Sequence, residues 1–262
     1  MTKFNDINIK KWKESDVWTD SLWLIDKRVK SGKHNNSYHG NFVPQIPHQL
    51  ILRYSKKGDT VFDPFLGNGT TAYECENLER NLIGIDIQKK LITQVQNNID
   101  TNKNFIELLN GDSTEEKTFN EVENILKKYN KKKIQFAILH PPYADIIKFS
   151  DLKSDLSNIK STKEFLDKFS VVLKNTIGIL EKGRYLAIII GDKYADGKWI
   201  PLGFNCLDEA QKIGLILKSI IIKNIEGNRA KQNKEPIWRY RALASDYYIF
   251  KHEYILIFKN DY

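Results

Sequence analysis

Short apolar runs alternate with amphipathic stretches along most of the chain after Phe42. The apolar runs have the length and β-branched content of buried strands, at 60–65, 81–87, 104–113, 134–139, 184–193, 217–225 and 252–259. Between them, apolar residues recur at helical spacing, at 46–55, 70–80, 88–101, 119–130, 165–183 and 205–217. Predicted strands and helices therefore alternate, except that no helical pattern separates the last two strands.

Strands that alternate with helices indicate βαβ units, in which helices cover both faces of a mostly parallel sheet. We therefore expect an α/β, Rossmann-like, doubly wound fold with a mostly parallel sheet and an antiparallel C-terminal hairpin. The domain should span 42–262, with a polar and basic insertion at about 226–247. Residues 1–41 are polar, with scattered tryptophans and no strong strand pattern, so we expect an N-terminal extension.

The composition limits the cellular compartment and the kind of binding partner that we expect for this protein. The chain has 262 residues, 41% hydrophobic, with a formal net charge of +8, and its pI is about 9.2. This balance is typical of a protein with an anionic partner, most commonly nucleic acid, although a lysine-rich proteome gives the same charge. Cys75 and Cys206 form neither a disulfide framework nor a zinc pattern. We expect no signal peptide, no membrane span and a cytoplasmic protein.

The first predicted strand runs into VFDPFLGNGTT, in which Gly67 and Gly69 stand between strand and helix. Glycines at that point let the backbone turn tightly and approach a ligand closely. A P-loop ends in Gly-Lys-Ser/Thr, whereas Gly69 is followed by Thr70, and the dinucleotide spacing G-x-G-x-x-G is also missing. The loop is therefore either a structural turn or a site for a ligand other than a triphosphate.

Acidic residues follow the next two predicted strands. Asp86 ends NLIGIDI about 20 residues after the loop, where a carboxylate accepts from the two hydroxyls of a ribose. Asp112, in NGDS, follows the third strand at the same expected edge. Each aspartate alone would also suit a helix cap or a turn. Together, at successive strand ends, they predict a site for a nucleoside without phosphates.

These motifs resemble those of a known family. DPFLGNGTT resembles the S-adenosyl-L-methionine loop of amino-group DNA methyltransferases, usually DPF-x-G-S/N-G-T-T, and HPPY resembles their catalytic motif, usually D/N/S-P-P-Y/F/W. IPHQLI before the loop and the closing strand HEYILIFK extend the resemblance from about Phe42 to Phe258. It implies S-adenosyl-L-methionine as cofactor, DNA as partner, a cognate restriction nuclease and no metal. The implied cofactor-binding residues are Asp63, Pro64, Phe65, Gly67, Gly69, Thr70, Asp86 and Asp112.

The resemblance makes His140, Pro141, Pro142 and Tyr143 the catalytic residues. The lone pair of an exocyclic amine is delocalised into the base, so acceptors on its N–H bonds must aim the lone pair at the methyl group. The Pro-Pro turn offers free carbonyls, and Tyr143 can stack on a flipped base. His140 can accept only as a neutral imidazole. Alternatively His140 is a packed histidine and Asp145 is the acceptor, or Tyr143 is a core residue.

The chain departs from the family pattern in two respects. His140 stands where Asp, Asn or Ser is usual, and the loop precedes the catalytic motif, whereas enzymes with this loop form commonly run in the opposite order. Only about 27 residues separate Asp112 from His140, and little follows Phe258, so we expect no separate target-recognition domain.

Basic and aromatic residues are interleaved in the insertion, a composition that suits phosphate contacts and base stacking, although a solvated loop would have it too. The insertion joins two strands expected to lie next to the catalytic strand, which would place it at the cleft. A second candidate for DNA contact is the tract 30–39 of the extension. The predicted nucleic-acid-binding residues are Arg229, Lys231, Trp238, Arg239 and Arg241.

Three functions remain open from the sequence. The first is a DNA methyltransferase acting on adenine N6 or cytosine N4, for restriction–modification or epigenetic marking. The others are an RNA base-amine methyltransferase and a non-catalytic nucleic-acid-binding module with a decayed cofactor site. In the family, Asp or Asn in the first catalytic position leans to adenine and Ser to cytosine, so His140 leaves the base open, with adenine slightly favoured.

Overall fold

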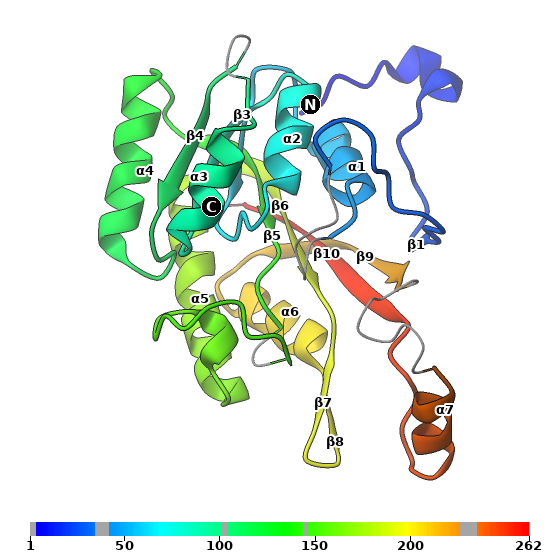
Figure 1. Ribbon diagram of the computed structural model, residues 1–262. Coiled ribbons are helices and arrows are strands. Elements are labelled where there is room, and N and C mark those ends of the chain that lie inside the picture. The colour runs from blue at the N-terminus through cyan, green and yellow to red at the C-terminus, as the bar shows by residue number, and fades with distance from the viewer. Residues whose placement is uncertain (1–3, 35–41, 101–103, 144–145, 226–234, 262) are drawn as a thin grey trace.

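A computed structural model describes residues 4–34, 42–100, 104–143, 146–225 and 235–261 of the chain. Eight strands form one sheet in the order β1-β9-β10-β6-β5-β2-β3-β4, and β7 and β8 form a separate two-stranded ribbon (Figure 1). The strands are β1 (Leu22–Trp23), β2 (Thr60–Asp63), β3 (Asn81–Asp86), β4 (Ile106–Asn110), β5 (Ile134–Leu139), β6 (Leu180–Ile190), β7 (Lys193–Ala195), β8 (Lys198–Ile200), β9 (Ile216–Asn224) and β10 (His252–Lys259).

The sheet is parallel from β4 through β3, β2 and β5 to β6. β10 pairs antiparallel with both β6 and β9, which confirms the mostly parallel sheet and the antiparallel pairing of the last two strands. Two details of the prediction were wrong. A helix does separate β9 from β10, and β6 lies between β10 and β5, the strand that carries the HPPY motif.

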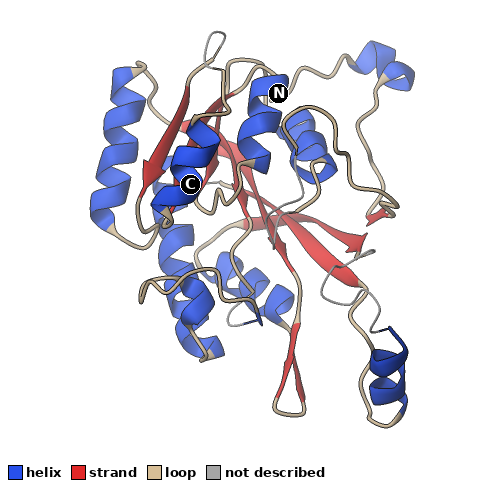
Figure 2. Ribbon diagram, in the orientation of Figure 1, coloured by secondary structure: helices blue, strands red, loops and turns tan. Residues whose placement is uncertain are grey.

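Helices cover both faces of the sheet, as a doubly wound fold requires (Figure 2). On one face α1 and α2 share a core with Val61, Phe136 and Ile189, and on the other α4, α5 and α6 share one with Phe62, Leu139 and Ile188. Adjacent strand residues such as Ile188 and Ile189 thus enter opposite cores. The α-helices are α1 (Gln45–Tyr54), α2 (Thr70–Asn77), α3 (Lys89–Gln96), α4 (Glu116–Lys128), α5 (Thr162–Ile179), α6 (Leu202–Lys212) and α7 (Glu235–Leu243), with 3₁₀ helices at Ile9–Glu14 and Leu156–Asn158.

Most helix ends differ from the pattern-based prediction by a few residues, and two of the differences have a local cause. The predicted helix 165–183 ends at Ile179, because Leu180 already pairs with Ile134 and the strand β6 begins there. Gly183 has φ +79°, a left-handed conformation that would interrupt a helix but that glycine adopts without strain. Likewise α6 ends at Lys212, two residues before Gly214 with φ +89°.

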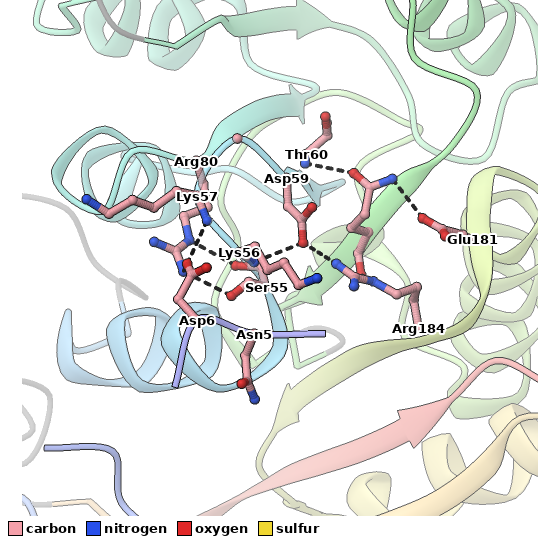
Figure 3. Close-up of polar contacts among 12 residues, drawn as sticks. Asn5, Asp6, Ser55, Lys56, Lys57, Asp59, Thr60, Arg80, Glu181 and Arg184 are labelled. Atoms are coloured by element: carbon pink, nitrogen blue, oxygen red, sulfur yellow. Dashed lines mark hydrogen bonds and ion pairs between the residues drawn. The ribbon is translucent and has the colours of Figure 1, made fainter. Parts of the chain in front are cut away.

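The N-terminal segment is tied to the amino edge of the sheet by polar contacts (Figure 3). The guanidinium of Arg80, buried at 2% exposure, donates to Asp6 at 3.0 Å and to the backbone carbonyl of Ser55 at 2.9 Å. Arg184 at the start of β6 pairs with Asp59, which precedes β2. These contacts hold the strands at the edge opposite to the one where their carboxyl ends meet.

The segment before α1 also contributes to the core. Trp23 is 4% exposed and its strand β1 pairs in parallel with the edge of β9. The backbone N–H of Ile25 donates to Asn224 Oδ1 at 2.7 Å. None of the described helices combines the length and the apolar character needed to cross a membrane.

Candidate active site

A pocket of about 500 Å³ lies at the carboxyl edge of the sheet, where β2, β3, β4, β5 and β6 end. Open α/β sheets place their ligands at this edge, and the volume is in the range of small-molecule sites. The predicted residues that line it are Pro64, Phe65, Gly67, Asp86, Asp112, His140, Pro141, Pro142 and Tyr143. The fold therefore brings both sequence motifs into one cavity.

The other predicted loop residues, Asp63, Gly69 and Thr70, do not line the pocket. They support the conformation of the loop. Asp63 is fully buried, and its Oδ1 accepts from the backbone N–H of Phe65 at 2.9 Å. Burial raises the pKa of Asp63 to about 7, against hydrogen bonds that favour the carboxylate. Gly69 has φ +79°, and a Cβ there would lie 2.6 Å from a methyl carbon of Val95, so only glycine fits this turn.

Asp86 stands at the end of β3 with its carboxylate held by the loop. Oδ2 accepts from the N–H of Gly67 and Oδ1 from the N–H of Gln88, each at 2.8 Å. Burial raises the pKa of Asp86 to about 6, in spite of these two hydrogen bonds. A carboxylate offers about four lone-pair sites, so it can still accept from two vicinal hydroxyls.

Asp112 presents a second acceptor. Its Oδ1 accepts from the backbone N–H and the hydroxyl of Thr114 at 2.8 and 2.7 Å. Its Oδ2 makes no hydrogen bond within the described ranges, which leaves it able to accept from an amine in the pocket. The neighbouring Ser113 donates to the carbonyl of Pro64 at 2.7 Å and so fixes the loop beside it. Two carboxylates and the Phe65 ring fit the ribose, amine and apolar parts of an adenosyl group.

The HPPY segment ends β5 and is held by a chain of polar contacts. His140 Nε2 lies 3.2 Å from the hydroxyl oxygen of Tyr143, and that hydroxyl donates to Glu253 Oε2 at 2.8 Å. Glu253 Oε1 accepts from Lys223 Nζ at 2.9 Å. Burial and the carboxylate of Glu253 raise the pKa of Tyr143 well above its usual value, so the hydroxyl keeps its proton.

The imidazole of His140 is enclosed by aromatic rings. Its centroid lies 4.8 Å from that of Phe42 and 5.7 Å from that of Tyr143. Burial lowers its pKa to about 4, so the ring is neutral at neutral pH, the state that an acceptor role requires. The alternative acceptor Asp145 lies outside the described residues.

The pattern-based prediction missed Lys223 and Glu253, which also line the pocket. Each is a charged residue directly beside the apolar run of its strand, β9 or β10, and both are 7% exposed. A charged residue next to an apolar run is also common at an exposed strand end, so the sequence alone did not show that these two residues are buried and paired.

The predicted nucleic-acid-binding residues are only partly described. Arg229 and Lys231 lie outside the described ranges, whereas Trp238, Arg239 and Arg241 lie on α7. The guanidinium carbon of Arg241 is 5.4 Å from the ring centroid of Trp238. Both α7 and the β7–β8 ribbon project from the body of the protein at the carboxyl edge (Figure 1). Within the described part of the chain, no group of three or more His, Cys, Asp or Glu side chains could hold a metal ion.

Comparison with known proteins finds a DNA methylase family model and Type II methyltransferases that resemble this chain. Residues 2–97 match the N6/N4 methyltransferase model, described as DNA methylase. The Type II methyltransferase M.MjaI of Methanocaldococcus jannaschii is 40% identical over 78 residues, 30% of this chain and 26% of that protein. M.HinfI of Haemophilus influenzae is 35% identical over 99 residues, 37% of this chain and 28% of that protein. The chain thus spans about a quarter of the length of the curated relatives it matches.

Solved structures share the fold at low identity. TrmN from Thermus thermophilus aligns with TM-score 0.53 and 13% identity, over 84% of this chain and 49% of that one. An S-adenosylmethionine-dependent methyltransferase from Methanosarcina mazei aligns with TM-score 0.51 and 11% identity, over 80% and 96% of the two chains.

The fold is therefore the Rossmann-like fold of S-adenosylmethionine-dependent methyltransferases. The resemblance to the amino-group DNA methyltransferases is confirmed by the family model and by the curated relatives, and S-adenosyl-L-methionine is the cofactor of that family.

Proposed function

We propose that this protein transfers a methyl group from S-adenosyl-L-methionine to an exocyclic amine of a base in DNA, with adenine N6 slightly favoured over cytosine N4. One observation carries the proposal: the two carboxylates that suit an adenosyl group and the HPPY segment line the same pocket. The Type II relatives support DNA as the substrate.

Asp86 would accept from the ribose hydroxyls and Asp112 from the adenine amine of the cofactor. When bound, the cofactor supplies a reactive sulfonium methyl group. The protein then has to place the amine nitrogen in line with that carbon, and positioning of this kind supplies much of a rate enhancement. A target base reaches such a recessed pocket only when it is flipped out of the duplex.

His140 and the carbonyl of Pro141 would accept from the two N–H bonds of the target amine. The prolines carry no N–H of their own, so they cannot donate to a neighbouring strand, and regular strand pairing stops here. Their carbonyls would then be free to accept from the substrate. The Tyr143 ring lines the same wall and would contact the plane of the base. The low pKa of His140 keeps its imidazole neutral and able to accept.

The test is transfer of labelled methyl from S-adenosyl-L-methionine to duplex DNA, followed by nucleoside analysis to identify the modified base. Tyr143→Ala is expected to abolish transfer and to retain binding of S-adenosylhomocysteine by calorimetry. Transfer to RNA and not to any DNA would overturn the substrate class. Absence of both transfer and cofactor binding would favour a non-catalytic nucleic-acid-binding module.

We further propose that the extension 1–41 and the basic insertion contact DNA beside the pocket, and that the modification serves restriction–modification or epigenetic marking. Sequencing that detects modified bases, on DNA from cells that express the protein, identifies the target base and the sequence around it. A recognition sequence shared with a nuclease of the same cell supports the restriction setting, and scattered modification without a motif contradicts both settings.

A further inference from the structure

Two oppositely charged residues face each other where β9 and β10 border the pocket. Lys223 of β9 and Glu253 of β10 are directly opposite in the strand register, and each is 7% exposed. A buried ion pair is costly unless its remaining hydrogen-bonding capacity is satisfied. Here Glu253 divides its oxygens: Oε1 accepts from Lys223 at 2.9 Å, and Oε2 accepts from the Tyr143 hydroxyl at 2.8 Å.

This division fixes the direction of the hydroxyl proton. Glu253 is ionised beside Lys223, and an ionised carboxylate can only accept. A tyrosine hydroxyl has one proton, and here it is directed to Glu253. The hydroxyl oxygen therefore has only lone pairs to offer His140, whose Nε2 lies 3.2 Å away.

The tautomer of His140 follows from that direction. A contact between Nε2 and an oxygen that can only accept requires the proton on Nε2. A neutral imidazole carries one ring proton, so Nδ1 then keeps its lone pair. Nδ1 makes no hydrogen bond to any residue within the described ranges, and His140 lines the pocket. Burial and the charge of Lys223 both oppose protonation of the ring, while the charge of Glu253 favours it.

We propose that the Lys223–Glu253 ion pair fixes His140 as its Nε2–H tautomer, so that Nδ1 is the atom that accepts from the target amine. Lys223 and Glu253 are positioning residues in this scheme, and they act through the hydroxyl of Tyr143. The inference rests on the proposed function in its final step, because the target amine belongs to that reaction. It gives a neutral histidine the acceptor role that Asp, Asn or Ser has in the motif that HPPY resembles.

The tautomer is measured directly by NMR on protein labelled with ¹⁵N-histidine. Two-bond proton–nitrogen correlations distinguish the Nε2–H form, the Nδ1–H form and the imidazolium, and His140→Gln assigns the signal among the 5 histidines. The wild type is expected to show His140 as Nε2–H at neutral pH. Detection of the Nδ1–H form, the imidazolium or a mixture overturns the inference.

Glu253→Gln tests the cause with an isosteric change. Lys223 needs an acceptor, so the glutamine oxygen faces Lys223 and its NH₂ group faces Tyr143. The amide then donates to the hydroxyl, the hydroxyl proton turns to Nε2, and His140 is expected to switch to Nδ1–H. Tyr143→Phe keeps the ion pair and removes the relay, and it is expected to give a mixture of tautomers. An unchanged Nε2–H signal in the folded Tyr143→Phe protein overturns the inference.

Tyr254→Phe is the matched control. The Tyr254 hydroxyl lies 3.2 Å from His252 Nε2 and donates to Asp192 at 3.3 Å, so it forms a similar chain that does not include His140. Its loss should leave the His140 signal unchanged. In the transfer assay, Glu253→Gln is expected to lower kcat by about 100-fold with little change in KM for DNA. A wild type with the expected tautomer but no methyl transfer would contradict the proposed function and leave the tautomer assignment standing.

Discussion

The Tyr143 ring is held at two points. Its hydroxyl is bonded to Glu253, and its edge lies against Gly191, the residue that follows β6. A Cβ on Gly191 would lie 2.9 Å from Cε2 of the ring, closer than carbon atoms approach without displacement. The absence of a side chain at Gly191 thus leaves the Tyr143 ring room to hold its position.

Gly191→Ala is therefore expected to displace the ring and to lower methyl transfer by about 10- to 100-fold, since small misplacements cost that much. Binding of S-adenosylhomocysteine should stay close to wild type, because Asp86 and Asp112, the residues proposed to bind the cofactor, lie at the ends of other strands. Gly178→Ala is the control: its Cβ meets nothing within 4 Å in α5, so transfer should be normal. A fully active Gly191→Ala protein would show that Tyr143 need not be held there.

In the proposed function, Asp86 would make cofactor binding depend on pH. The pKa of its carboxyl, 3.8 in an unperturbed aspartate, is raised to about 6 by burial. The folded protein therefore binds more protons than the unfolded chain between these values, and the free energy of unfolding falls as pH rises through that window. The ribose hydroxyls need the carboxylate, so affinity for S-adenosylhomocysteine should fall as pH is lowered through about 6.

Calorimetry from acidic to mildly alkaline pH measures this dependence. Asp86→Asn should bind more weakly and should lose most of the pH dependence. Asp63→Asn should keep it, although burial raises the pKa of Asp63 to about 7, because Asp63 does not line the pocket. If Asp63→Asn removes the pH dependence and Asp86→Asn keeps it, the titrating carboxylate is Asp63, and the assignment to Asp86 is wrong.

At the scale of elements, long buried strands were predictable and short exposed ones were not. The ranges 134–139 and 252–259 are correct to the residue, because polar or turn residues bound each apolar run. β1, the β7–β8 ribbon and α7 are short or exposed and have no apolar periodicity to reveal them. The facing of Lys223 and Glu253 depends on strand register across the sheet, which a local pattern does not contain.

The packing of β1 in the structure implies that Trp23 contributes to stability, which the sequence pattern did not indicate. Trp23 is 4% exposed, packs edge-on against Trp18 at 5.0 Å, and donates to the carbonyl of Asp20 at 2.9 Å. Trp23→Ala is expected to lower the free energy of unfolding by about 3 kcal/mol. Trp12, which is 63% exposed, is the matched control, and Trp12→Ala should change it by less than about 0.5 kcal/mol. Urea denaturation measures both, and equal effects would contradict the packing of this segment.

Across the whole molecule, the amino ends and the carboxyl ends of the strands carry different features. The amino edge carries the contacts of Asp6, Arg80, Asp59 and Arg184, which hold the strands together (Figure 3). The carboxyl edge carries the pocket, and α7 and the β7–β8 ribbon extend beyond it (Figure 1). In the proposed function a duplex would reach the pocket from this edge, so the basic residues expected to matter for DNA are those placed there and not the net charge of +8 as such.

The salt dependence of DNA binding distinguishes specific contacts of basic residues at the carboxyl edge from a general effect of the net charge. Each basic side chain that neutralises a phosphate contributes about one unit to the slope of log affinity against log salt. Arg239→Ala with Arg241→Ala on α7 is expected to reduce that slope by about two and to leave S-adenosylhomocysteine binding unchanged. Lys127→Ala with Lys132→Ala removes the same charge from exposed positions at and beyond the C-terminal end of α4, before β5 begins at the amino edge. If both double variants reduce the slope equally, DNA responds to the overall charge and α7 has no specific contact; a loss confined to the α7 variant locates the duplex beside the pocket.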